Sequence, residues 1–151
     1  MTVSFCGHRG FIRTPELENK LLAILEERVG DSAVEFYLGS HGAFDAFAFD
    51  CCCKFREKHK AASLVLVTPY LSANKALELS CGQGCKYDCI LYPEIENKPK
   101  RLAIIYRNAY VVKNSDLVIA YIAHTFGGAY KAFLKAKQLG VEVINLARDT
   151  Q

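Results

Sequence analysis

The sequence lacks the features that mark membrane and secreted proteins. None of its apolar runs approaches the roughly 20 residues that a helix needs to cross a bilayer. Met1 is followed almost at once by a short apolar run at residues 3–6, with no basic leader, no long apolar segment and no cleavage pattern. We therefore expect a cytoplasmic protein that has no membrane partner.

The sequence also lacks a marked excess of either charge. Lysine and arginine together number 19, aspartate and glutamate number 16, and the basic residues are scattered along the chain, which leaves a net charge of +3. A nucleic-acid-binding face usually gathers its lysines and arginines in one patch or stripe. The composition therefore counts against a nucleic-acid partner, whereas a small anionic ligand needs only a few positive groups.

The seven cysteines show neither a disulfide framework nor a metal motif. Their number is odd and no secretion pattern precedes them, so we expect reduced thiols. The run at residues 51–53 lies on a predicted helix and is expected to pack as small apolar groups. Cys81, Cys85 and Cys89 are evenly spaced, but glycines interrupt the helix that would align them, and their role stays open. Because the histidines also lack the short spacing of zinc motifs, we expect no metal and no cofactor.

What the sequence does contain is an alternation of short apolar runs with amphipathic helical patterns. The strand-like runs fall at residues 3–6, 34–38, 64–67, 117–122 and 141–146. A length of 151 residues suits one domain with one core. We predict a single α/β domain over residues 1–151, a Rossmann-like, doubly wound three-layer sandwich. Its mainly parallel sheet should have about five strands in the order 3-2-1-4-5, with a long crossover over residues 71–99 that could include a minor strand near 89–92.

Three of the predicted strands end in turns that contain glycine. The strand at 117–122 leads to Gly127-Gly128 and then a helix, and such a turn lets backbone N–H groups approach a phosphate at the positive end of the helix. The motifs G-H-R-G at 7–10 and G-S-H-G-A-F-D at 39–45 follow two earlier strands. In the predicted sheet all three turns meet at the carboxyl ends of the strands, where α/β proteins bind ligands. Ordinary turns are the alternative reading of each motif taken alone.

The same turns carry side chains suited to an anionic ligand. Arg9 and Arg107 could each make paired hydrogen bonds to phosphate or carboxylate, or lie on the surface as solvated charges. The histidines could hydrogen-bond a ligand or carry protons. Asp45 could contact a ribose, or only favour the start of the second helix. The aromatic residues could stack on a base or pack the rim.

These turns, with their neighbours, supply the predicted ligand-binding set, in which we assign no catalytic residue and no metal ligand. It comprises Gly7, His8, Arg9, Gly39, Ser40, His41, Gly42, Asp45, Pro69, Tyr70, Arg107, His124, Thr125, Phe126, Gly127, Gly128 and Tyr130.

Five motifs in this order resemble the SLOG superfamily, whose relatives include Smf and lonely-guy proteins, and in particular its small stand-alone bacterial and phage members. The motifs are F-C-G-H-R at 5–9, G-x-x-G-A-F-D at 39–45, V-T-P-Y at 67–70, R-N-x-x-V-V-x-N-S-D at 107–116 and F-G-G-A-Y at 126–130. The resemblance implies a Rossmann-like domain that binds nucleotide-derived ligands. The family's ligand-contacting positions match Gly7, His8, Arg9, Gly39, Gly42, Asp45, Gly127 and Gly128.

The resemblance also bears on whether the protein is an enzyme. The branch similar to cytokinin-activating phosphoribohydrolases has a glutamate about one helical turn after the glycine turn, whereas this chain has Lys131, Ala132, Phe133 and Leu134 there. We therefore expect a binding module, which acts as a sensor or sequesters a molecule such as an ADP-ribose or NAD derivative or a cyclic nucleotide. A phage protein that captures an immune second messenger would fit this role.

Three alternatives stay open at the level of the sequence. The first is a nucleotide N-glycosidase or phosphoribohydrolase-like enzyme that uses Arg107 together with Asp45 or a histidine. The second is a DNA-processing accessory, against which the balanced charge counts. The third concerns assembly, since the apolar second helix could pair two copies of the chain in a homo-oligomer.

Overall fold

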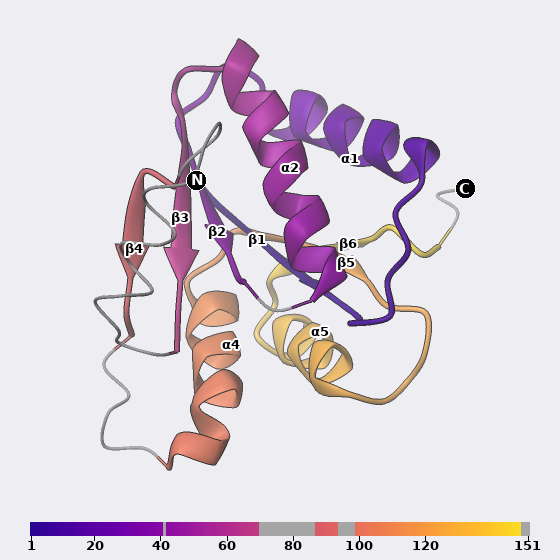
Figure 1. Cartoon of the computed structure of the whole chain (residues 1–151), viewed down its shortest axis with the longest axis vertical. Coiled ribbons are helices and arrows are strands. Elements are labelled where there is room, and N and C mark those ends of the chain that lie inside the picture. The colour runs from indigo at the N-terminus through magenta and orange to yellow at the C-terminus, as the bar shows by residue number, and fades with distance from the viewer. Residues whose placement is uncertain (41, 70–86, 94–98, 149–151) are drawn as a thin grey trace.

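The protein is an α/β sandwich built on one parallel sheet, as predicted (Figure 1). The computed structural model describes residues 1–40, 42–69, 87–93 and 99–148. The elements in chain order are β1 (Thr2–Gly7), α1 (Pro15–Arg28), β2 (Val34–Leu38), α2 (Ala43–Lys58), β3 (Ala62–Val67), β4 (Cys89–Leu91), the short 3-10 helix η1 (Lys100–Leu102), α4 (Ala103–Lys113), β5 (Leu117–Tyr121), α5 (Gly128–Gln138) and β6 (Glu142–Asn145).

The sheet has six strands in the order β4-β3-β2-β1-β5-β6, and every neighbouring pair is parallel. The predicted order of the five main strands is confirmed, and the short β4 is added at the edge beside β3. Asp88 fixes this edge, since its backbone N–H donates to the Leu64 carbonyl at 2.7 Å and its carboxylate accepts from the Leu64 N–H at 2.7 Å. A strand of three residues is too short to give a clear period-2 pattern, so the sequence indicated a minor strand near residues 89–92 only as an option.

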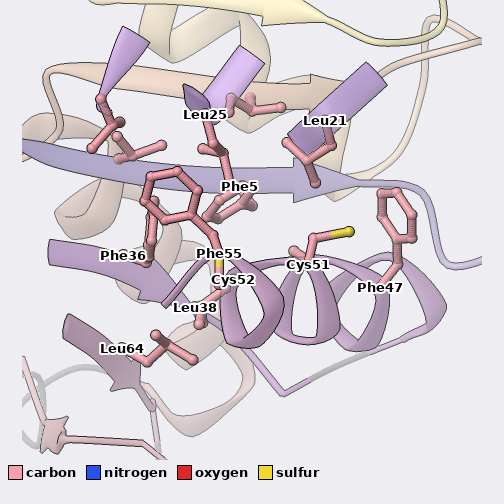
Figure 2. Close-up of a cluster of buried hydrophobic side chains, with 14 of the residues drawn as sticks. Phe5, Leu21, Leu25, Phe36, Leu38, Phe47, Cys51, Cys52, Phe55 and Leu64 are labelled. Carbon is pink, nitrogen blue, oxygen red and sulfur yellow. The ribbon is translucent and has the colours of Figure 1, made fainter. Parts of the chain in front are cut away.

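Strand β1 lies in the middle of the sheet and packs on both faces. Val3 and Phe5 point into the larger core, which α1 and α2 cover (Figure 2). On the opposite face Ser4 accepts a hydrogen bond from the Ser115 hydroxyl at 2.7 Å, and α4 and α5 cover the sheet there. Successive side chains of β1 therefore point alternately to the two faces of the sheet and pack in both layers of the sandwich.

The core beneath α1 and α2 is rich in phenylalanine and cysteine. Cys51 and Cys52 are buried in it, as expected for small apolar groups, and Figure 2 shows them beside Phe47 and Phe55 on α2. Cys53 is part of a disulfide bond, so the expectation of seven reduced thiols is wrong. An odd number of cysteines does not exclude a single pair.

No helix in the described ranges is both long and apolar enough to span a bilayer. The cysteines Cys81 and Cys85 lie outside the described residues, whereas Cys89 is exposed on β4 as a free thiol.

A close approach between β1 and α2 generates the first prediction. A Cβ on Gly7 would overlap the Phe44 ring and lie 2.8 Å from the Phe44 Cβ, and Phe44 is 1% exposed. We expect Gly7→Ala to destabilise the fold by about 1–3 kcal/mol through overpacking, which lowers the melting temperature by roughly 2–12 °C.

The matched control is Gly10→Ala, because a Cβ at Gly10 meets no atom within 4 Å in the described part of the chain. Its free energy of unfolding should stay within about 0.5 kcal/mol of the wild-type value. Equal losses from both substitutions in thermal or urea unfolding would show that the contact with Phe44 is not what requires glycine at position 7.

Candidate ligand-binding site

The main cavity lies at the carboxyl ends of β1 and β5 and has a volume of about 430 Å³. This volume falls within the range of roughly 300–1,000 Å³ that is usual for small-molecule sites. Strand β1 pairs with β2 on one side and with β5 on the other, so the cavity opens at the point where the strand order reverses. Ligands of open α/β sheets bind at this position, and the three glycine turns were predicted to meet at this edge of the sheet.

The cavity gathers residues from four separate segments. Nine of the predicted site residues line it, namely Gly7, His8, Arg9, Asp45, Arg107, His124, Phe126, Gly127 and Gly128. Six further lining residues were not predicted, namely Phe5, Cys6, Gly10, Ile104, Asn108 and Ala129. Ile104 lies three residues before Arg107 on α4, and Asn108 lies one residue after it. If Arg107 faces a ligand, these helical neighbours are close to the same cavity, and this spacing was the signal that could have identified them.

The other predicted residues have different positions. Gly39, Ser40, Gly42, Pro69, Thr125 and Tyr130 are not among the lining residues, whereas His41 and Tyr70 lie outside the described residues. Gly39 nevertheless shapes the site, because a Cβ there would lie 2.6 Å from the Asp45 Oδ2 and 2.9 Å from the Arg107 Nη2. Glycine at the end of β2 therefore allows these two side chains to approach the strand.

Arg107 is the central charged group of the site. Its side chain is buried, with the residue 7% exposed, and it comes from the middle of α4. The Nε–H donates to the Val67 carbonyl at 2.9 Å and the Nη1–H donates to the Asn108 Oδ1 at 2.9 Å. Nη2 has no hydrogen-bond partner among the described residues. Burial lowers the pKa of the guanidinium, Asp45 acts in the opposite direction, and an arginine side chain stays protonated in proteins.

Buried polar atoms without hydrogen bonds are concentrated at this end of the sheet. Within the described residues there are three such side-chain atoms, the Ser40 Oγ, the Arg107 Nη2 and the His124 Nδ1. Ser40 follows β2, His124 follows β5, and Arg107 reaches the carboxyl end of β3 through Val67. Folded proteins satisfy nearly all their buried polar groups, so a cluster of exceptions marks a place where polar contacts remain to be made.

Two helices begin at this rim in the same unusual way. Gly42 precedes α2 with φ +95° and ψ 174°, and Gly127 precedes α5 with φ +94° and ψ 172°. Neither helix start has a hydrogen bond from a capping side chain. The positive φ explains why glycine is needed at both positions. At α5, Gly127, Gly128 and Ala129 line the cavity, and the dipole of a helix favours an anion at its start.

Three aromatic rings form a stack at the mouth of the cavity. The ring centroids of His8 and His124 are 3.4 Å apart at an interplanar angle of 17°, and those of His124 and Phe126 are 3.8 Å apart at 21°. His8 is 9% exposed, whereas Phe126 is 68% exposed. The stack therefore runs from the interior to a large apolar ring at the surface.

Cys6 is the one thiol among the described lining residues, and it is not suited to nucleophilic chemistry at neutral pH. Burial, with a further contribution from Asp45, raises the pKa of the Cys6 thiol to about 12. The thiolate is the reactive form of cysteine, so this side chain stays protonated and inert. No group of three or more potential metal ligands occurs within the described ranges.

Comparison of the chain with protein-family models and with curated proteins found no match.

The raised pKa of the Cys6 thiol generates the second prediction. In the folded protein, iodoacetamide at about pH 8 should leave Cys6 unlabelled over a time in which the exposed Cys89 reacts, even though partial burial, Glu35 and Asp88 also raise the pKa of Cys89. After unfolding in urea both cysteines should react alike, and mass spectrometry of the peptides reads both results. Labelling of Cys6 in the folded state as fast as Cys89 would show that its thiolate is accessible in the cavity.

Proposed function

We propose that this protein binds a nucleotide-derived small molecule in the cavity at the ends of β1 and β5, as a sensor or as a sequestering protein. The observation that carries the proposal is the buried Arg107 guanidinium, which lies beside Asp45 in the same cavity as the glycine-capped start of α5. Its Nη2 has no hydrogen-bond partner in the part of the chain that the structure describes. A buried positive charge with unused donors and a helix start suit a phosphate or diphosphate.

The lining residues suggest how such a ligand would be held. The backbone N–H groups at the start of α5 and the Arg107 guanidinium would bind phosphate oxygens. The Asp45 carboxylate would accept hydrogen bonds from ribose hydroxyls, and the exposed ring of Phe126 offers a surface on which a base could stack. ADP-ribose, NAD-related molecules and cyclic nucleotides combine these groups, and the resemblance to the SLOG superfamily supports the same class of ligand.

Capture without turnover is the form of this function that the residues favour. The helix α5 has no acidic residue in its first turn, and Lys131 and Leu134 are exposed where the hydrolytic branch of the family has its glutamate. Glycosidic cleavage requires a group that stabilises the positive charge developing on the sugar and activates water. Lys131 instead adds positive charge near an anion. A phage protein that captures an immune second messenger would need this property.

An enzymatic function has one observation in its favour. Asp45 lies close to Arg107 at Gly39 and is the one carboxylate among the described lining residues, so a nucleotide N-glycosidase could use these two groups.

The third prediction tests binding at the start of α5. A nucleotide-derived ligand at about 100 times its dissociation constant should stabilise the protein by roughly 2.7 kcal/mol, which raises the melting temperature by about 5–10 °C. The panel should include ADP-ribose, NAD, cyclic ADP-ribose isomers and cyclic dinucleotides. Gly128→Asp should abolish the shift, because it places a carboxylate where we expect the phosphate.

Gly128→Ala is the matched control for this variant. Among the described residues a Cβ at Gly128 meets no atom within 4 Å, and Gly128 does not have a positive φ, so both substitutions should leave the fold intact. An aspartate in the first turn is even favourable to the helix dipole. If no member of the panel shifts the wild-type protein, or if Gly128→Asp responds as Gly128→Ala does, the proposed site is wrong.

The fourth prediction separates capture from catalysis. Ligand recovered from the wild-type protein by heat denaturation should be chemically intact after prolonged incubation, as judged by mass spectrometry. Free base and ribose phosphate released over many turnovers, and lost in Arg107→Ala and in Asp45→Asn, would instead establish the enzyme.

A further inference from the structure

The resemblance to the SLOG superfamily implies that His8 contacts the ligand, but the contacts of its ring give it another task. His8 follows β1, and its Nε2 lies 3.0 Å from the backbone nitrogen of Ala123 and 3.4 Å from that of His124, in the loop that leaves β5. A backbone N–H can only donate, so Nε2 must accept and therefore carries no proton. The neutral imidazole then has its proton on Nδ1.

These hydrogen bonds connect the two central strands of the sheet beyond their ends. The loop held by His8 comprises residues 122–127. It ends at Gly127 and is followed directly by α5. The stack of His8 on His124 and of His124 on Phe126 continues the connection to the residue just before Gly127. The place and direction of the glycine turn therefore depend on the His8 side chain, which directly follows β1 and is only 9% exposed.

We propose that His8 is a positioning residue, which holds the β5–α5 loop, and with it the anion-binding start of α5, only while its imidazole is neutral. The inference rests on the proposed function, which assigns anion binding to the start of α5. It assigns His8 no direct contact with the ligand through Nε2, since both backbone donors already occupy that atom.

Protonation would break the arrangement. An imidazolium has a donor on both nitrogens, so the N–H groups of Ala123 and His124 would lose their acceptor and face a positive group. The other titratable or charged groups that line the same cavity are Cys6 and Arg9 near His8 in the chain, Asp45 on α2, Arg107 on α4 and His124 on the loop.

The surroundings of His8 favour the neutral form. Burial, and then the adjacent His124, both lower the pKa of His8 from its usual value near 6.5. At neutral pH the ring is therefore uncharged and the loop is held, and the loop is released only as the pH falls through this lowered pKa. If only protein with a neutral His8 binds the ligand, the apparent affinity falls about tenfold for each further pH unit below the pKa of His8.

The fifth prediction has a test that needs no ligand. In ¹⁵N-labelled protein at about pH 7.5, long-range imidazole spectra should show His8 with its proton on Nδ1. On acidification towards pH 5, the amide signals of Ala123, Gly127 and Gly128 should shift with the same midpoint as the His8 ring. A proton on Nε2, or loop amides that do not follow the ring, would overturn the proposal whatever the ligand turns out to be.

Variants then connect the hydrogen bond to binding. In His8→Gln the Oε1 can take the place of Nε2 as acceptor and does not titrate, whereas His8→Leu supplies no acceptor, and His124→Phe keeps the ring stack and leaves His8 intact. With ADP-ribose as the probe, whose diphosphate does not titrate in this range, the dissociation constant of wild-type and His124→Phe protein should rise as the pH falls.

Binding to His8→Gln should be close to that of the wild type at about pH 7.5 and independent of pH, whereas His8→Leu should bind weakly at both ends of the range. Parallel pH dependence in wild type and His8→Gln would contradict the role of His8. Absence of ADP-ribose binding at every pH would count against the proposed function, and the ligand-free spectra would still decide the role of His8.

Discussion

The candidate site depends on one buried positive charge. A guanidinium loses much of its hydration when it is buried, and it is tolerated only where hydrogen bonds and a counter-charge compensate. Arg107 donates two hydrogen bonds, to the Val67 carbonyl and to the Asn108 Oδ1, and it lies near Asp45. Its position requires a residue without a Cβ at the end of β2, which explains Gly39. Nη2, which carries two N–H groups, has no hydrogen-bond partner among the described residues, and we propose that these donors attract an anion.

Around this charge the sheet combines three strand-turn-helix units that are far apart in the sequence. Strand β1 leads to His8 and Arg9, β2 leads to Asp45 on α2, and β5 leads to the glycine turn of α5. The start of α2 and the start of α5 have the same backbone geometry, so the same glycine turn occurs twice at this rim. The stack of His8 on His124 connects the first unit to the third in the loop before the turn.

Much of this arrangement could be predicted because it follows from local patterns. Continuous apolar runs identified the parallel strands, and glycine after three of them located the rim. Features that depend on side-chain direction could not be predicted in this way. Ile104 and Asn108 enter the cavity because of the rotation of α4, His8 turns its Nε2 to the neighbouring loop rather than to a ligand, and the disulfide of Cys53 depends on proximity in space. Strand β4 depends on pairing with β3 more than on its own three residues.

The most direct test of the central claim is native mass spectrometry of the protein after incubation with the small-molecule fraction of cells and removal of unbound material, with Arg107→Ala in parallel. The account predicts that wild-type protein carries one stoichiometric adduct, which yields an intact nucleotide-derived compound on denaturation, and that Arg107→Ala carries none. Wild-type protein that takes up no such compound, or an adduct that Arg107→Ala retains in full, would contradict the assignment of this cavity as a nucleotide-ligand site organised by a buried guanidinium.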